Sequence, residues 1–218
     1  MISINIMDSS LIGVYATCTD DICLVPYGCD SKTIEEIKKE LNVNIYKCLI
    51  NNSVLVGSLC KGNTNGLIVS DYFTSKILEK ITKKKIILLN GKMNAIGNIM
   101  LLNDNACLIH PNTPERYIEK IKRNLKVDVL KGTIGNIKNV GMAGYVTNNG
   151  IIVNSKVSDE ELYTIEKLFQ MKPKICTVNF GSFMIGSAVL SNKYGCITGK
   201  DTTGYEFGQI IKGLGFIN

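Results

Sequence analysis

Ile12-Gly13, an apolar residue followed by glycine, opens a pattern that recurs along the whole chain. The pair returns at steps of 40 to 47 residues, and a short apolar strand follows each glycine after nine residues, or after six in the fourth copy. A repeat of this length is typical of proteins built from stacked or radially arranged copies of one supersecondary unit. The five copies are Ile12-Gly13, Val56-Gly57, Ile96-Gly97, Ala143-Gly144 and Ile185-Gly186.

Each repeat is predicted to form two strands, a helix and a third strand. In the first repeat, residues 11–17 and 22–25 read as strands, residues 32–41 have apolar side chains at helical spacing, and residues 44–50 read as the third strand. A second helix is predicted near residues 74–83, and in the third repeat Thr113 is predicted to cap the helix. The last two helices are predicted to begin with capping boxes at Ser158 and Thr203.

The two ends of the chain are predicted to complete one unit. The fifth repeat leaves little room for a third strand, whereas residues 1–7 alternate like a strand that has no place in the first repeat. An unpaired strand edge is a liability, so residues 1–7 are predicted to close the ring. The fold class expected is α/β, a closed five-bladed propeller with strands lining a central channel and helices outside. One domain is expected over 1–218, with repeats at about 8–50, 51–91, 92–135, 136–180 and 181–218.

The composition sets broad limits on the class of protein. The chain has 218 residues, of which 45% are hydrophobic, and a formal net charge of +6, which suits a protein with a sizeable core. No apolar run reaches the roughly 18 residues of a membrane helix, and residues 1–7 lack the layout of a signal peptide. We therefore expect a cytoplasmic protein that binds no membrane. The positive charge favours an anionic partner without identifying a nucleic acid.

Eight cysteines and one histidine are the residues most able to carry chemistry. The cysteines show neither a Cys-x-x-Cys pair nor a zinc-binding spacing, and those beside repeat strands read as small buried hydrophobes. Disulfides are left open, because some hyperthermophile cytosolic proteins use them. His110 ends a strand before Pro111 and reads as a turn residue. No nucleotide-binding glycine motif follows a strand, so neither a metal nor a cofactor is expected.

The repeated glycines indicate where the units approach each other. A glycine within a strand usually marks a bulge or a close backbone contact, and the axis of a tight ring requires such contact. The residues after the glycines are then predicted to form one small, rigid, polar ring, which favours recognition over catalysis. Asp201 and Thr202 are further candidate contacts, because the adjacent capping box uses only Thr203 and Glu206. The ring residues are Val14, Ser58, Asn98, Tyr145 and Ser187.

Several short stretches with a distinctive order are spread over the whole chain. They are Ile12-Gly13, Val56-Gly-Ser-Leu-Cys60 with Gly62-Asn63 and Gly66-Leu67-Ile68-Val69, Ala95-Ile-Gly-Asn98, Asn103-Asp104, Leu108-Ile-His-Pro111, Gly132-Thr-Ile134, Thr177-Val-Asn179 and Asp201-Thr-Thr-Gly204. In these stretches the chain resembles the translation initiation factor 6 family, the ribosome anti-association factors of archaea and eukaryotes. The chain stops soon after the last helix, without the tail of eukaryotic members, and lysine, isoleucine and asparagine are abundant, which suggests an archaeal member.

The resemblance implies a fold, a partner and a set of contact residues. The fold would be the five-fold pentein propeller. The partner would be the large ribosomal subunit, bound through ribosomal proteins and rRNA near the sarcin-ricin loop, so that joining of the small subunit is blocked. A role in large-subunit maturation, a monomeric state and the absence of catalysis are also implied. The candidate ribosome-binding residues are Asn98, Ser58, Asn63, Asp104, Tyr145, Asn179, Ser187, Asp201 and Thr202.

Among these candidates, Asn98 and Ser58 differ in how well they match the family. Asn98 lies in the family's Gly-Asn motif on the predicted ring, so the resemblance transfers its role most directly. Ser58 stands where some eukaryotic members have a basic residue, so a contact there follows less directly from the resemblance.

Two alternative functions are left open. Pentein enzymes modify guanidino groups with a cysteine nucleophile, a histidine and carboxylates, and Cys196 and His110 would take these parts here, although no acidic pair is evident near either residue. The other alternative is a general binding platform for RNA or another protein. An RNA platform would bind naked RNA with a steep salt dependence.

Overall fold

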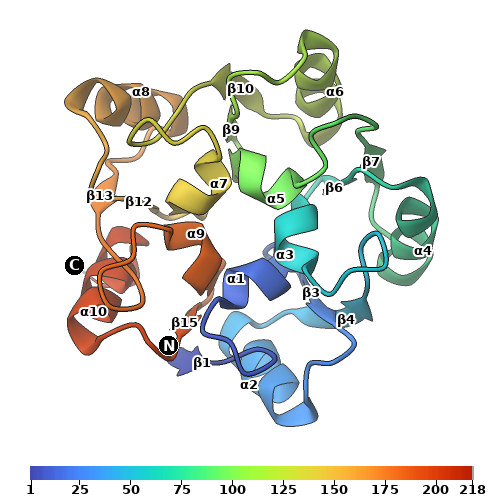
Figure 1. Cartoon of the computed structure of the whole chain (residues 1–218), viewed down its shortest axis with the longest axis horizontal. Coiled ribbons are helices and arrows are strands. Elements are labelled where there is room, and N and C mark those ends of the chain that lie inside the picture. Colours follow the sequence, from blue (N-terminus) through green and yellow to red (C-terminus); the bar gives the residue numbers. More distant parts are fainter. Residues whose placement is uncertain (218) are drawn as a thin grey trace.

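The computed structural model describes residues 1–217, which form five similar units arranged around a common axis (Figure 1). Each unit contains a three-stranded sheet in which the first two strands are antiparallel and the third is parallel to the second. A long helix follows the second strand and lies on the outside of the ring. The fold is therefore mixed α/β with five small sheets.

The sheets follow the order of the repeats. Their strands are β2 (Thr17–Cys18), β3 (Ile22–Pro26) and β4 (Asn44–Cys48); β5 (Lys61–Asn63), β6 (Gly66–Val69) and β7 (Ile86–Leu88); β8 (Met100–Leu102), β9 (Ala106–Ile109) and β10 (Asp128–Lys131); β11 (Gly144–Val146), β12 (Ile151–Val153) and β13 (Lys174–Ile175); and β14 (Val189–Ser191), β15 (Cys196–Gly199) and β1 (Ile2–Ile4).

The five outer helices begin close to the predicted positions. Both bonds of the capping boxes predicted at Ser158 and Thr203 are present. In the third unit the prediction was wrong by one residue, because Pro114 and not Thr113 is the N-cap residue. None of the helices within residues 1–217 combines the length and the hydropathy needed to cross a membrane. The outer helices are α2 (Ser31–Leu41), α4 (Tyr72–Thr82), α6 (Glu115–Leu125), α8 (Asp159–Phe169) and α10 (Gly204–Gly213).

The segments around the repeated glycines are one-turn helices, and the strand expected for residues 11–17 is therefore mostly wrong. The first residue of each short helix is buried and anchors it in the core. The short helices lie side by side around the axis (Figure 1), so helices and not only strands surround the centre of the ring. They are α1 (Ile12–Tyr15), α3 (Val56–Leu59), α5 (Ile96–Ile99), α7 (Val140–Ala143) and α9 (Ile185–Ala188).

The glycine of each short helix lies against the backbone of the short helix before it. A Cβ atom on Gly57 would overlap the carbonyl oxygen of Gly13, and one on Gly97 would overlap that of Gly57. The other pairs are Gly141 with Gly97, Gly186 with Gly141, and Gly13 with Gly186. The last pair joins the fifth unit to the first, so the contacts form a closed cycle that only residues without a side chain permit.

In the fourth unit the contact glycine is Gly141, and the assignment of Gly144 to this position is wrong. Gly144 begins β11 instead. With Gly141, the steps to the neighbouring glycines become 44 and 45 residues, and Gly150 follows after nine residues as in the other repeats. The residue after the glycine in the fourth unit is therefore Met142, not Tyr145.

The N-terminal strand completes the fifth sheet. β1 runs parallel to β15 with Ile2 opposite Ile197, and the hydroxyl oxygens of Ser3 and Thr198 lie 2.9 Å apart. Ile4 packs in a buried cluster with residues of the first unit. The N- and C-terminal ends of the described chain therefore belong to the same unit (Figure 1).

The apolar cores lie between neighbouring units. The cluster beneath α2 combines Val25 and Ile37 of the first unit with Leu190 and Ile197 of the fifth. The cluster beneath α4 likewise joins residues of the first and second sheets. Because each cluster draws residues from two units, an isolated unit could not bury its own apolar face.

Candidate functional site

The axis of the ring has two different ends, with a separate cavity at each. The five short helices surround one end, which we call the short-helix mouth, and the loops between the first two strands of each sheet surround the other, which we call the hairpin mouth. The short-helix mouth is lined by the residues that follow the five glycines, Val14, Ser58, Asn98, Met142 and Ser187. The loop tips at the hairpin mouth are Asp20, Thr64, Asp104, Asn148 and Lys193.

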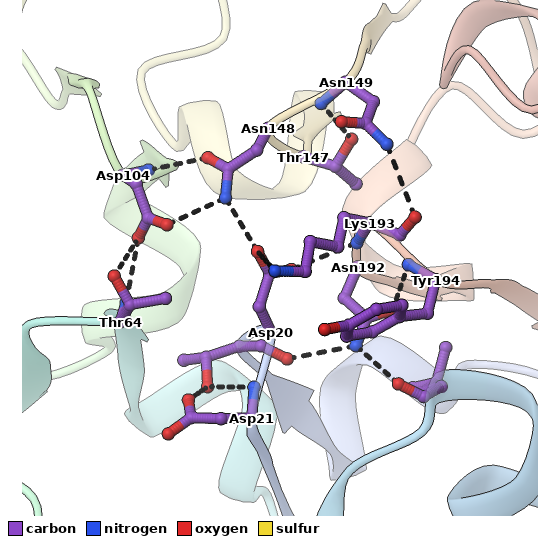
Figure 2. A network of polar contacts seen from close by, with 12 residues as sticks. Asp20, Asp21, Thr64, Asp104, Thr147, Asn148, Asn149, Asn192, Lys193 and Tyr194 are labelled. Carbon is purple, nitrogen blue, oxygen red and sulfur yellow. Dashed lines mark hydrogen bonds and ion pairs between the residues drawn. The ribbon is translucent and has the colours of Figure 1, made fainter.

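Hydrogen bonds between the loop tips close the hairpin mouth (Figure 2). Asp104 Oδ1 accepts hydrogen bonds from Thr64 N at 2.8 Å and from Thr64 Oγ1 at 2.9 Å. Asn148 Nδ2 donates to Asp104 Oδ2 at 2.8 Å and to Asp20 Oδ2 at 2.9 Å. Lys193 N donates to Asp20 Oδ1 at 3.0 Å. Every unit contributes one member, so these polar groups already have partners inside the protein.

The short-helix mouth carries polar side chains without such a network. Asn98 N donates to Ala95 O at 3.0 Å within its own turn, while the residue lines the mouth. Ser187 Oγ donates to Met184 O at 2.6 Å, which leaves its oxygen free to accept. Within residues 1–217, no hydrogen bond joins the side chains of two residues of this ring. Ser58 and Ser187 are buried and Asn98 is partly exposed, so Asn98 is the polar residue of this ring best placed to form a hydrogen bond with a partner.

Three neighbouring units place exposed apolar side chains on the rim of the short-helix mouth. The residues directly before α9, α1 and α3 are Met184, Leu11 and Leu55, and they are 39%, 43% and 39% exposed. Phe180, in the turn before α9, is also exposed. We call these four residues the apolar arc. Side chains of this kind on a rigid rim favour contact with a protein surface.

The third and fourth units have a different rim. The residues before α5 and α7 are Ala95 and Asn139, neither of them a large apolar residue. Lys92 and Lys138 stand exposed in the same segments, and we call them the basic arc. The rim therefore has an apolar side and a positively charged side, and the second of these suits an anionic partner.

Glutamates of the outer helices hold the turns that lead to the rim. Glu206 Oε1 accepts hydrogen bonds from Thr177 Oγ1 at 2.8 Å and from Gly181 N at 2.7 Å. Its Oε2 accepts from Phe180 N at 3.3 Å and from Thr203 N at 2.8 Å. Burial by itself raises the pKa of Glu206, but these hydrogen bonds outweigh burial, and the pKa lies below its ordinary value.

Replacing Glu206 with glutamine should make the protein less stable at neutral pH and flatten its acid sensitivity. A carboxylate with a lowered pKa in the folded state stabilises above its unfolded pKa of about 4.3, and this contribution is lost as the pH falls through the folded pKa. We expect Glu206→Gln to lower the free energy of unfolding by about 2–3 kcal/mol at pH 7, since an amide cannot accept all these bonds. Denaturant unfolding at pH 7 and pH 3 checks this.

Glu166→Gln, at an exposed site on α8, is the control for the removal of a glutamate charge and should change stability by less than about 0.5 kcal/mol. Equal pH dependence in the wild type and in Glu206→Gln would contradict the role given to this carboxylate.

Asn179, Asp201 and Thr202 meet at the joint between the fifth and first units. Asn179 Nδ2 donates to Ser10 O at 3.2 Å, and Thr202 Oγ1 donates to Asn179 Oδ1 at 2.9 Å. Asp201 Oδ2 accepts from Ser10 Oγ at 2.6 Å. These three candidates therefore stabilise the contact between the fifth and first units, near the short-helix mouth.

The remaining candidates lie elsewhere. Tyr145 is buried near the axis of the ring, where its hydroxyl donates to Ser191 O and accepts from Ser191 N, both at 2.9 Å. Asn63 is buried and binds the carbonyl oxygens of Asn103 and Leu125, each at 3.2 Å. Asp104 belongs to the hairpin mouth. Of the nine candidates, Ser58, Asn98 and Ser187 lie together at the short-helix mouth, and Tyr145 lines the same cavity.

The chain is similar in sequence to a family of known proteins. The sequence model of the eIF-6 family matches residues 1–213. The chain belongs to the eIF-6 family. Translation initiation factor 6 from Methanosarcina acetivorans and from Methanosarcina mazei are each 42% identical to it over 215 residues, which cover 99% of this chain and 98% of theirs. The factor of the same name from Thermoplasma acidophilum is 36% identical over 208 residues, covering 94% of this chain and 95% of its own.

In this member of the eIF-6 family, the cysteine and histidine of the alternative enzymatic reading are not arranged as a catalytic pair. Cys196 lies buried in β15, and burial raises the pKa of its thiol to about 12. His110 follows β9, two sheets away, and its Nδ1 accepts a hydrogen bond from Asn112 N at 3.1 Å. A protonated, buried thiol is a poor nucleophile. Cys196 therefore has neither the thiolate nor the adjacent base that this chemistry requires.

Sequence reasoning missed Met142 and the apolar arc of this family member. The signal for Met142 was present, because only Gly141 keeps the nine-residue distance to Gly150. Leu11, Leu55 and Met184 gave no such signal, since an apolar residue beside an apolar-glycine pair reads as core. Their exposure follows from the one-turn helices, which place the preceding residue on the rim.

Proposed function

We propose that the chain binds the large ribosomal subunit through its short-helix mouth and sterically prevents association with the small subunit. Membership of the eIF-6 family, whose matched relatives are named translation initiation factors, supports a role in translation initiation. The contact would lie near the sarcin-ricin loop, and the protein would also take part in large-subunit maturation in the cytoplasm. The fold would be the closed, monomeric pentein propeller that the resemblance implies.

The contrast between the two ends of the axis carries this assignment. Polar groups at the hairpin mouth bind one another, whereas within residues 1–217 the side chains of Ser58, Asn98 and Ser187 at the short-helix mouth form no hydrogen bonds with one another. The glycine cycle holds the five short helices close together, so the face is rigid before any partner arrives. A preorganised surface loses little conformational entropy on binding. A rigid obstacle is what a steric block requires.

The two arcs suit a partner made of both protein and RNA. Leu11, Leu55 and Met184 offer apolar contact to a ribosomal protein. Lys92 and Lys138 offer positive charge to rRNA phosphates. We propose that the apolar arc contacts protein and the basic arc contacts rRNA. In this arrangement Ser58, Asn98 and Ser187 lie in the centre of the interface.

Asn98→Arg tests the docking face. The larger side chain stands on a rigid mouth that cannot yield, so it holds the two surfaces apart. We expect affinity for purified large subunits, measured by co-sedimentation, to fall by at least about 10-fold, equivalent to about 1.4 kcal/mol. Subunit-joining assays should show a matching loss of inhibition. Asn105→Arg makes the same substitution at an exposed position of the hairpin mouth and should bind like the wild type.

The same pair of variants separates the proposal from a general RNA platform. An added arginine strengthens binding to naked RNA, because it supplies another phosphate contact. Tighter binding of Asn98→Arg to naked RNA, with undiminished binding to large subunits, would therefore favour the platform. Weaker subunit binding by Asn105→Arg alone would move the docking face to the hairpin mouth.

A further inference from the structure

The turn that leads to α9 is one residue longer than the corresponding turns of three other units. It lies between the bridged residues Val178 and Ser182, which enclose three residues. All three have a left-handed backbone, with φ of 43° at Asn179, 59° at Phe180 and 91° at Gly181. We call residues 178–182 the long turn. The shorter turns enclose two residues each, between the bridged pairs Ile6 and Ser9, Ile50 and Ser53, and Ile134 and Ile137.

Phe180 has a backbone conformation that suits smaller residues better. A left-handed backbone brings the Cβ atom of an L-residue close to a carbonyl oxygen, a conformation that glycine, asparagine and aspartate tolerate and that bulky residues rarely adopt. The second and fourth units have Asn51-Asn52 and Gly135-Asn136 at these positions. In the first unit Met7 is also left-handed, but its side chain lies against Gly28. The long turn therefore carries an aromatic residue where asparagine would be less strained.

The ring of Phe180 gains little from packing within the protein. Its side chain is 80% exposed, the highest value among the large apolar residues of the described chain. It belongs to none of the five apolar clusters. Within residues 1–217 the ring is paired with neither an aromatic nor a basic side chain. Contacts of the ring inside the protein therefore do not offset the backbone strain.

Hydrogen bonds nevertheless hold the long turn in place. Glu206 accepts hydrogen bonds from the backbone N–H groups of Phe180 and of the residue after it. The side chain of Asn179 donates to Ser10 O at 3.2 Å, and Ser10 directly precedes Leu11 of the apolar arc. The turn is thus bound to both the fifth and the first unit, so the strained Phe180 is held at a fixed position on the rim.

We propose that Phe180 is the anchor residue of the docking surface and that its ring inserts into an apolar pocket on a protein of the large ribosomal subunit. This inference rests on the proposed docking function. Strained residues cluster where their conformation serves binding, and a ring on a fixed backbone buries much apolar area at a small cost in conformational entropy. A few such residues carry most of the energy of an interface. A protein pocket is favoured because Phe180 belongs to the apolar arc, whereas the basic arc lies in the third and fourth units.

Phe180→Asn should make the fold more stable and docking weaker. Asparagine relieves the strain, so we expect the unfolding midpoint to rise by about 2–4 °C. Loss of the ring should lower the affinity for purified large subunits, measured by co-sedimentation, by about 30-fold. A merely structural role of Phe180 would not give these opposite changes.

The outcomes separate this inference from the proposed function. Unchanged affinity of Phe180→Asn, beside weaker binding of Asn98→Arg, would overturn the anchor and leave the docking face in place. An unchanged or lower unfolding midpoint of Phe180→Asn would contradict the strain from which the anchor is inferred. Absence of subunit binding by the wild type would overturn both proposals.

Tyr163→Asn and Phe180→Leu are the matched variants. Tyr163 is an exposed aromatic residue within α8, so its replacement should shift the midpoint by less than about 2 °C and leave the affinity unchanged. Phe180→Leu keeps an apolar side chain at the left-handed position, so it should unfold like the wild type and lose less affinity than Phe180→Asn. An equal loss of affinity in both Phe180 variants would indicate stacking on an rRNA base and overturn the apolar pocket.

Photocrosslinking tests the class of partner directly. With p-benzoylphenylalanine in place of Phe180, we expect light-dependent attachment to a ribosomal protein of the purified large subunit. The same group in place of Tyr163 should give no attachment. Attachment of the group at position 180 to rRNA alone would overturn the proposed protein pocket.

Discussion

Replacing Gly97 with alanine is expected to prevent the protein from folding. The new Cβ atom would overlap the carbonyl oxygen of Gly57 and crowd that of Cys60, which are backbone atoms and cannot rotate away. Gly57 is itself held against Gly13 in the same cycle, so α3 cannot retreat. We expect destabilisation above about 5 kcal/mol, comparable with the whole stability of many domains. Circular dichroism and thermal unfolding of the purified variant would show it.

Gly208→Ala is the matched control for this prediction. Gly208 lies in α10, and a Cβ atom there would meet nothing within 4 Å. The change should therefore stabilise the protein by about 0.5–1 kcal/mol through helix propensity. If the unfolding midpoint of Gly97→Ala lay within about 2 °C of the wild-type value, the close packing of the five short helices would be wrong.

Replacing Asn192 with alanine should open the joint between the fifth and first units. Asn192 is buried, and its Nδ2 donates to Thr19 O at 3.2 Å and to Leu41 O at 2.8 Å, both in the first unit. Its Oδ1 accepts from Tyr194 N and Gly195 N. The variant removes the partner of three buried backbone groups and of the partly buried Tyr194 N–H, so we expect a loss of about 3–5 kcal/mol in the free energy of unfolding.

Asn112→Ala provides the comparison for Asn192→Ala. Asn112 is exposed beside His110, and its replacement should change stability by less than about 0.5 kcal/mol. Urea unfolding of both variants measures the difference. Equal stability of the two would show that the bonds of Asn192 across the joint contribute nothing to closure.

The repeat and the place of the closing strand could be predicted from sequence, but the local structure of the five short helices could not. A one-turn helix such as α1 is shorter than the window in which helical periodicity becomes visible, and Ile12-Gly13-Val14-Tyr15 resembles a strand. Contact with neighbouring short helices fixes its conformation. The fourth repeat was misaligned because Gly141 and Gly144 both follow an apolar residue.

The candidate site was predictable where it depends on position within the repeat. The position directly after the contact glycine of a short helix correctly located Ser58, Asn98 and Ser187 at the short-helix mouth. The network at the hairpin mouth depends on how Asp20, Asp104 and Asn148 meet across the axis. No spacing along the chain encodes that meeting, because it exists only once the five units have joined.

The pairing of β1 with β15 sets an order on the protein's synthesis. Ile2 is synthesised long before its partner Ile197. β1 must therefore stay free of other strands until β15 has been synthesised. The contact between Gly13 and Gly186 also cannot form before Gly186 has been synthesised. An incomplete nascent chain therefore cannot form the complete short-helix mouth.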